Sequence, residues 1–344
     1  MKKRALVIAP GRGTYNKAEL GYFARHHHDK KALMAQIDAY RATQGQDPIS
    51  ALDGADVYSI KHHTRGDNAS PLIYGCAYAD YLAINRDKYD IACVTGNSMG
   101  WYIALACAGA LPFDGALHLI NTMGTLMQKA LIGGQMIYPF INDNWEVDAD
   151  QKQHLLNLIK EINARPDHDL YISIMLGGML VFGGNEAALS ALKDVLPPLQ
   201  DRFPLILPNH AAFHTPLQRP ISAEAQDIFD PSMFENPHTP LIDGRGHVWR
   251  PYATADDEIF NYTLGHQVYE YYDFTRAVQV SVKEYAPDCI IILGPGTTLG
   301  GAVAQSLIEI CWQGMHDKAA FIARQKDDPY ILTMGMDEQR ALVV

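Results

Sequence analysis

The chain has 344 residues, a length that allows a large core and more than one structural unit. Hydrophobic residues make up 48% of the chain and charged residues 19%, a balance that excludes a disordered polymer. Lys and Arg number 28 against 39 Asp and Glu, and the net charge of −11 disfavours nucleic acid as a partner.

The cysteine content and the hydropathy of the chain indicate its cellular compartment. The cysteines number five and show no CxxC spacing, so we expect neither a disulfide framework nor a zinc cluster. A reducing, cytoplasmic compartment fits this pattern best. The longest apolar stretch, Leu170 to Phe182, is interrupted by two glycines and is shorter than the roughly 20 residues of a membrane span. We therefore expect no contact with a membrane.

Two short apolar runs in the first third of the chain are each followed by a glycine-rich loop. Ala5–Ala9 precedes Pro10-Gly11-Arg12-Gly13, which is typical of a buried parallel strand that ends in a tight turn. Tyr89–Val94 is a second such strand, and after Gly96–Gly100 a helix-forming run continues to Ala108. Both loops are predicted at the carboxyl ends of their strands.

An amphipathic helix is predicted between these two strands. Apolar residues recur at helical spacing from Leu72 to Leu82. Ser70 precedes them as a capping residue, and Pro71 occupies the first helical position. We therefore expect this helix to begin at Ser70.

The middle of the chain has a different pattern from its two ends. Between Gly134 and Pro208 we predict strand, helix, two strands, helix and strand, in the ranges 135–141, 150–162, either side of Gly177-Gly178, 185–196 and 203–207. This βαββαβ order predicts a ferredoxin-like subdomain at 134–208, inserted in an α/β unit made of 1–133 and 209–344. The α/β pattern resumes in that unit with a buried strand at Cys289–Leu293 and a helix at Leu299–Ile310.

The strongest chemical motif is Gly96-Asn97-Ser98-Met99-Gly100, which matches the G-x-S-x-G nucleophile elbow. Its glycines permit a strained turn between strand and helix, where the serine hydroxyl is exposed. At a helix N-terminus the dipole favours the Ser98 alkoxide, and the Met99 amide points to where an oxyanion would form. The alternative is a structural turn in which Ser98 only caps the helix.

A nucleophilic serine needs a base, and the chain has 14 histidines. His26–His28 and His62-His63 lie in polar surroundings, and we expect them to be solvated rather than to hold a metal. His214 follows the predicted strand that ends at Leu207, so it can lie on a loop beside the elbow. Residue type alone does not decide between His214 and the other histidines.

Three segments of this chain resemble one known family. Residues 70–130, the segment Ala212-Phe213-His214-Thr215-Pro216, and the run from Gln267 to Val278 followed by Gly294-Pro295-Gly296 look like malonyl-CoA:acyl-carrier-protein transacylases and the acyltransferase domains of fatty-acid and polyketide synthases. The resemblance covers most of the chain in the family's order. It implies a large α/β hydrolase-like unit with an inserted ferredoxin-like subdomain.

The resemblance also implies roles for individual residues. Ser98 matches the family nucleophile that becomes acylated, and His214 matches its general base and acid. Gln267 matches the residue whose main-chain carbonyl orients that histidine, in place of a triad carboxylate. The amides of Arg12 and Met99 match the two donors of the oxyanion hole.

The activity implied by the resemblance is acyl transfer in two steps. Ser98 accepts an acyl group from a CoA thioester, and the phosphopantetheine thiol of an acyl carrier protein then takes that group. The partners are acyl-CoA and the carrier protein, and the implied chemistry needs no metal and no permanently bound cofactor. A basic surface cluster of Arg25, Lys30 and Lys31 is a candidate docking site for an acidic carrier.

Three positions depart from the family pattern and concern the choice of substrate. Asn97 stands where the family commonly has His, and Met123 stands where it has the arginine that binds the malonyl carboxylate. Arg12 stands where it has Gln, so Arg12 is a candidate for a relocated carboxylate clamp. Alternatively, Arg12 points to solvent or to the CoA phosphates, and Met123 forms an apolar floor for an uncharged acyl chain. Phe213 is a bulky residue that disfavours α-branched acyl groups.

Two other functions remain open. A thioester hydrolase on the same scaffold would release acyl groups from carrier proteins, and water access to the acyl-serine would distinguish it from a transferase. A non-catalytic scaffold would dock partners without using Ser98 at all.

Overall fold

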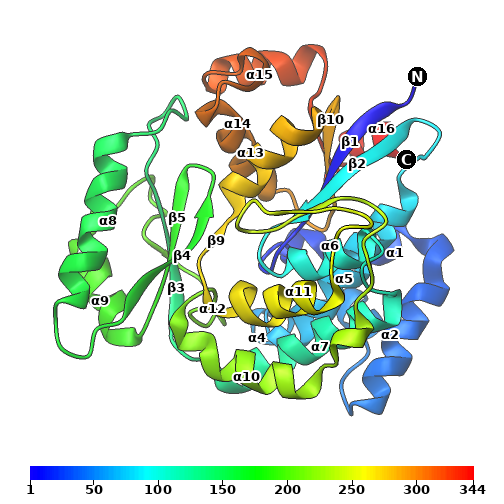
Figure 1. The fold of residues 1–344 in the computed structure, drawn as a ribbon, viewed down its shortest axis with the longest axis horizontal. Helices are drawn as coiled ribbons and strands as arrows, with labels where there is room; N and C mark the ends of the chain where they lie inside the picture. Colours follow the sequence, from blue (N-terminus) through cyan, green and yellow to red (C-terminus); the bar gives the residue numbers. More distant parts are fainter.

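The computed structural model describes residues 1–344, apart from the side chain of Asp256. The chain forms two sheets, each with its own helices, and the smaller sheet lies to one side of the larger one (Figure 1). This arrangement confirms the predicted α/β class, with a parallel sheet and a second, ferredoxin-like layer. None of the described helices combines the length and the apolar character needed to cross a membrane.

The larger sheet has six strands in the order β11-β10-β1-β2-β7-β8. All its neighbours are parallel except β7 and β8. The central strands are short apolar runs, as expected for strands that helices cover on both faces. The strands are β1 (Lys3–Ala9), β2 (Tyr89–Gly96), β7 (Leu241–Ile242), β8 (Val248–Trp249), β10 (Cys289–Ile292) and β11 (Ile331–Thr333).

In the described chain, fourteen α-helices belong to this larger unit and surround its sheet (Figure 1). They are α1 (Tyr22–His26), α2 (Lys31–Thr43), α3 (Ile49–Asp53), α4 (Ile60–His63), α5 (Gly66–Ala83), α6 (Gly100–Cys107), α7 (Phe113–Ala130), α10 (Arg219–Ile228), α11 (Asp256–Asn261), α12 (Gln267–Tyr269), α13 (Phe274–Tyr285), α14 (Leu299–Glu309), α15 (Lys318–Asp327) and α16 (Asp337–Val343).

The helix expected to begin at Ser70 begins one turn earlier, and this prediction was wrong. Helix α5 starts at Gly66 and continues through Pro71. Pro71 cannot donate to the carbonyl of Asp67, but that carbonyl accepts a hydrogen bond of 2.5 Å from Arg41 Nη1 instead. The buried Arg41 guanidinium thus replaces the bond that the proline removes, and the helix tolerates the proline in its interior.

The smaller sheet has the order β6-β3-β5-β4-β9 and is antiparallel except for the pair of β4 and β9. Its strands are β3 (Gly134–Pro139), β4 (Leu170–Leu176), β5 (Met179–Gly184), β6 (Leu205–Ile206) and β9 (Tyr272–Asp273). Strand β6 is shorter than the predicted 203–207. Strand β9 arrives from the larger unit and extends the smaller sheet at its edge.

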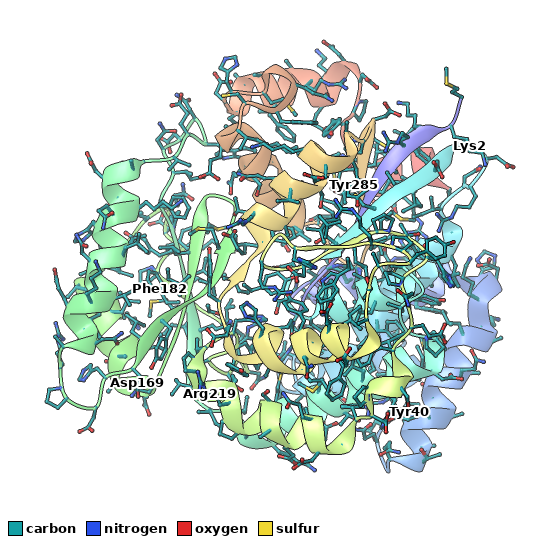
Figure 2. All side chains as sticks on the ribbon, in the orientation of Figure 1. Lys2, Tyr40, Asp169, Phe182, Arg219 and Tyr285 are labelled. Carbon is teal, nitrogen blue, oxygen red and sulfur yellow. The ribbon has the colours of Figure 1, made fainter. Side chains whose placement is uncertain are left out.

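Helices α8 (Ala149–Asn163) and α9 (Glu186–Val195) cover the outer face of the smaller sheet (Figure 1). A separate hydrophobic core fills the space between these helices and the strands, with Phe182 fully buried in it. Figure 2 labels Phe182 and Asp169 on this side of the molecule. The helices, strands and separate core are those of a ferredoxin-like layer.

Two of the histidines that were expected to be solvated are buried, and that prediction was wrong. His27 is fully buried, with Nε2 2.7 Å from Asp80 Oδ1, and Asp80 also binds Arg340 Nη1 at 2.6 Å. Burial alone would raise the Asp80 pKa, but His27 and Arg340 hold it below its ordinary value. His63 is buried as well and bonds to the carbonyl of Leu52. The polar neighbours of these histidines in the sequence did not reveal their partners, which are not adjacent in the chain.

Candidate active site

Ser98 lies at the turn between β2 and α6, with a backbone φ of +56° in the left-handed region. The backbone at this turn packs so closely that positions 96 and 100 have no room for a side chain. A Cβ at Gly96 would collide with the Gly100 carbonyl, and a Cβ at Gly100 would collide with the carbonyl of Ala9. The two glycines therefore bring the elbow against the end of β1 and hold Ser98 at the edge of the sheet.

His214 contacts Ser98 directly. Ser98 Oγ lies 2.7 Å from His214 Nε2, and His214 Nδ1 lies 2.6 Å from the main-chain oxygen of Gln267. Since a carbonyl can only accept, Nδ1 carries the proton and Nε2 is left to accept from the serine hydroxyl. His214 also has a φ of +56°, and its own N–H donates to the Val268 carbonyl at 3.1 Å.

The environment of His214 suits a base. Burial lowers the pKa of His214 to about 4, although the hydrogen bond to the Gln267 carbonyl acts in the opposite direction. The imidazole is therefore neutral at pH 7 and free to accept a proton. The imidazolium formed by that transfer would be stabilised by the same carbonyl.

The loop after β1 packs against the elbow. The Asn97 N–H donates to the Ala9 carbonyl at 3.1 Å, and a Cβ at Gly11 would lie 2.6 Å from the Asn97 carbonyl oxygen. Among the residues that the structure describes, the amides of Arg12 and Met99 have no acceptor. Asn97 points its Nδ2 atom toward Gly11 and lies outside the wall of the cavity beside Ser98.

The Arg12 side chain reaches into the protein rather than into solvent. Its Nη2 donates to the carbonyls of Thr64 (3.0 Å) and Asn209 (2.9 Å), and its guanidinium carbon lies 5.2 Å from the centre of the Phe213 ring. Its Nε and Nη1 atoms are buried and have no hydrogen-bond partner in the described part of the chain. Burial lowers the pKa of Arg12 to about 10, so the group stays charged at pH 7. The alternative in which Arg12 points to solvent is therefore wrong.

A small cavity of about 20 Å³ lies beside Ser98. Its lining includes Arg12, Ser98, Phe213 and His214, and also Met123 of α7, which is buried. The cavity has room for about one water molecule. It brings together a charged guanidinium, the serine hydroxyl and an apolar surface.

The smaller sheet holds the loop that carries His214. Ser173 Oγ of β4 donates to the Phe213 carbonyl at 2.7 Å and accepts from Gln135 Nε2 of β3 at 2.6 Å. Gln135 Oε1 in turn lies 2.8 Å from His210 Nδ1. The sequence analysis missed these residues, and the only signal for them was a polar residue within each apolar strand.

The structure brings most of the predicted site residues together and separates a few. Residues that line or adjoin the cavity are Arg12, Ser98, Met99, Met123, Phe213, His214 and Gln267. The proposed docking cluster lies on and between α1 and α2, where Lys30 pairs with Asp29 at 2.8 Å and Arg25 bonds to the Leu20 carbonyl. None of its three residues is part of the cavity wall among the described residues.

Curated relatives of this chain include several malonyl CoA-acyl carrier protein transacylases. No family model matches the chain. The malonyl CoA-acyl carrier protein transacylase of Haemophilus influenzae is 25% identical over 245 residues, which are 67% of this chain and 70% of the relative. The polyketide biosynthesis transacylase PksC of Bacillus subtilis is 24% identical over 240 residues, 68% of this chain and 76% of the relative.

Solved structures share the fold across nearly the whole chain. The malonyl-CoA:acyl carrier protein transacylase of Xanthomonas oryzae matches with a TM-score of 0.74 and 18% identity, covering 99% of this chain and 98% of its own. A malonyl-transacylase solved in complex with a type II polyketide acyl carrier protein matches at 0.69 and 18% identity, covering 89% and 93%. The resemblance seen in the sequence motifs is thereby confirmed: in sequence the chain is similar to malonyl CoA-acyl carrier protein transacylases, and in fold it is similar to their solved structures.

Proposed function

We propose that this protein transfers an acyl group from a CoA thioester to the phosphopantetheine thiol of an acyl carrier protein through an acyl-Ser98 intermediate. The observation that carries the proposal is the continuous chain from Ser98 Oγ through His214 to the Gln267 carbonyl, with separations of 2.7 Å and 2.6 Å. Relatives with malonyl CoA-acyl carrier protein transacylase in their names support the substrate pair.

In the first half-reaction Ser98 Oγ attacks the thioester carbonyl and His214 Nε2 takes the hydroxyl proton. The amides of Arg12 and Met99 stabilise the oxyanion, and a donor of this kind typically contributes about 2.7–4 kcal/mol. The intermediate then expels the CoA thiolate, which receives the proton from His214. The carrier's thiol reverses these steps in the second half-reaction, and no metal or bound cofactor takes part.

The Arg12 side chain is the proposed carboxylate clamp, so the preferred acyl group is a short one with a terminal carboxylate, as in malonyl. Its Nη2 atom is already used by two carbonyls, but the buried Nε and Nη1 atoms remain unpaired, and each is a charged donor that can bind one carboxylate oxygen. Met123 gives the cavity wall an apolar surface, and Phe213 both supports Arg12 and restricts branching.

Intact-mass spectrometry after brief incubation with malonyl-, acetyl- and longer acyl-CoA tests both parts of the proposal. A covalent adduct is expected in the wild type and none in Ser98→Ala. In Arg12→Ala the malonyl rate relative to the acetyl rate should fall by about 10²- to 10³-fold, because the substrate carboxylate loses its buried partner. Arg65→Ala is the matched control, since Arg65 is exposed and pairs with Asp67.

The outcomes separate the remaining candidates. Equal malonyl and acetyl rates in wild type and Arg12→Ala would contradict the clamp and make Met123 the floor of an alkyl pocket. Met123 stands where the family has its carboxylate-binding arginine, and this difference favours a second candidate function, that of a thioester hydrolase. A stable adduct that a carrier thiol discharges supports the transferase, whereas rapid decay in water would support the hydrolase. An absence of any adduct would leave a non-catalytic scaffold.

A further inference from the structure

We infer that Tyr102 is a positioning residue that holds the catalytic pair through the side chain of Gln267. This inference rests on the proposed function of Ser98 and His214. It concerns the side chains around the pair, whereas the resemblance assigns a role only to the main-chain carbonyl of Gln267.

Gln267 contacts both members of the pair. Its main-chain carbonyl accepts from His214 Nδ1 at 2.6 Å, and its side-chain Nε2 donates to the Ser98 carbonyl at 3.1 Å. Its Oε1 accepts from the Tyr102 hydroxyl at 2.7 Å. Tyr102 is therefore linked to Ser98 through the Gln267 side chain. Gln267 also orients the base, His214, through its main-chain carbonyl.

The Ser98 carbonyl determines which way the Gln267 amide faces, and the Tyr102 hydroxyl then holds the Oε1 end in place. An amide has a donor end and an acceptor end of nearly the same shape, so it can turn over unless its neighbours distinguish them. A flipped amide would set Oε1 against the Ser98 carbonyl, where two acceptors repel. Burial raises the pKa of Tyr102, so its O–H stays available to hold Oε1 in place.

The backbone at Ser98 and at His214 adopts a conformation that the surrounding contacts must stabilise. Ser98 and His214 each have a φ of +56°, a conformation that non-glycine residues keep only where their surroundings impose it. Gln267 follows a π-helical turn at Tyr262–His266, a rare conformation that is frequent at functional sites. Trp101, the neighbour of Tyr102 on α6, donates to Thr263 Oγ1 in that turn at 2.9 Å. Two consecutive aromatic residues after the elbow thus anchor the segment that orients the base.

A double-mutant cycle on the full-length protein tests the inference. The variants are Tyr102→Phe, Gln267→Met and the two combined, with Tyr74→Phe as control because the Tyr74 hydroxyl is buried and bonds to the Phe113 carbonyl elsewhere. The single-turnover rate of Ser98 acylation and the KM for acyl-CoA are measured for each. We expect about a tenfold lower rate in Tyr102→Phe with unchanged KM, because the reacting atoms are less well aligned.

The double variant distinguishes action through Gln267 from a separate role. We expect it to be no slower than Gln267→Met, because Tyr102 then has no side chain to hold. Multiplying losses, or a raised KM with an unchanged rate in Tyr102→Phe, would overturn the inference and give Tyr102 a role in substrate binding. A wild type that forms no adduct would instead contradict the proposed function. Ser98 labelling by an organophosphorus fluoride reports the folded, reactive fraction of each variant.

Discussion

The two sheets contribute to the candidate site in different ways. The larger sheet places Ser98 and the Arg12 loop directly, because both follow the carboxyl ends of adjacent parallel strands, β2 and β1. The smaller sheet places His214 indirectly, through hydrogen bonds from Ser173 and Gln135 to the loop that carries it. The nucleophile is thus fixed by local backbone geometry, whereas the base depends on side chains from another layer.

Tyr272 joins the two arrangements. It lies in β9, which pairs with β4 of the smaller sheet, and its hydroxyl donates to the carbonyl of Gly96 at 2.6 Å. Its ring lies 5.2 Å from that of His214. The separation of Ser98 and His214 therefore depends on how the larger sheet and the smaller sheet pack against each other. A substitution in either sheet should alter it.

Removal of the base is the most severe way to break the arrangement. His214→Ala should lower the rate of Ser98 acylation by about 10²- to 10⁴-fold, because no other group accepts the hydroxyl proton. Rapid-quench mass spectrometry with acyl-CoA measures this rate. The melting temperature serves as the control for folding. A variant that acylates as fast as wild type would exclude His214 as the base.

A milder change tests the support from the smaller sheet. Ser173→Ala leaves the Phe213 carbonyl without its partner, and we expect about a tenfold lower acylation rate because His214 is the next residue. The unfolding free energy should also fall, by about 1–3 kcal/mol for the unpaired buried groups. Chemical denaturation measures the second effect.

Ser281→Ala is the matched control for Ser173→Ala. Ser281 is also fully buried and donates to a main-chain carbonyl, that of Ala277, but on α13 of the larger unit. It should lower stability without changing the acylation rate of the folded protein. Equal effects of both substitutions on the rate would mean that the smaller sheet has no special role in placing His214.

A change of pH near neutrality should have the smallest effect on the rate of Ser98 acylation. The lowered His214 pKa of about 4 means that the imidazole is already neutral above pH 5 and becomes protonated only below that. The acylation rate should therefore be nearly constant between pH 6 and 8 and fall as the pH drops toward 4. A rate that still rises between pH 6 and 8 would mean that the base is more exposed than the structure indicates.

Those parts of the fold and the site that depend on short stretches of chain could be predicted from the sequence. The Ser98 elbow and the strand before it are continuous, so glycine spacing and an apolar run were sufficient. The start of α5 could not be predicted, because it depends on the carbonyl of Asp67 being taken by Arg41, 26 residues away. Residue type likewise did not single out His214, whose place depends on the other sheet, and only the family resemblance indicated it.

The side chain of Arg12 illustrates a further limit. Its position in the loop was predictable, but its direction was not, since the acceptors at Thr64 and Asn209 belong to two distant segments. The same holds for Tyr102, which sequence analysis assigned only to a helix-forming run. Side-chain direction depends on long-range partners that a single sequence does not reveal.

The buried carboxylate of Asp80 has a consequence for the order in which the chain assembles. Its partners are Tyr22 and His27 near the start of the chain and Arg340 on α16, 260 residues after it. During synthesis the segments that carry Tyr22, His27 and Asp80 emerge long before Arg340, so Asp80 stays without its arginine until α16 leaves the ribosome. A buried carboxylate that lacks its partner is costly, and the interior around α5 is therefore expected to close late.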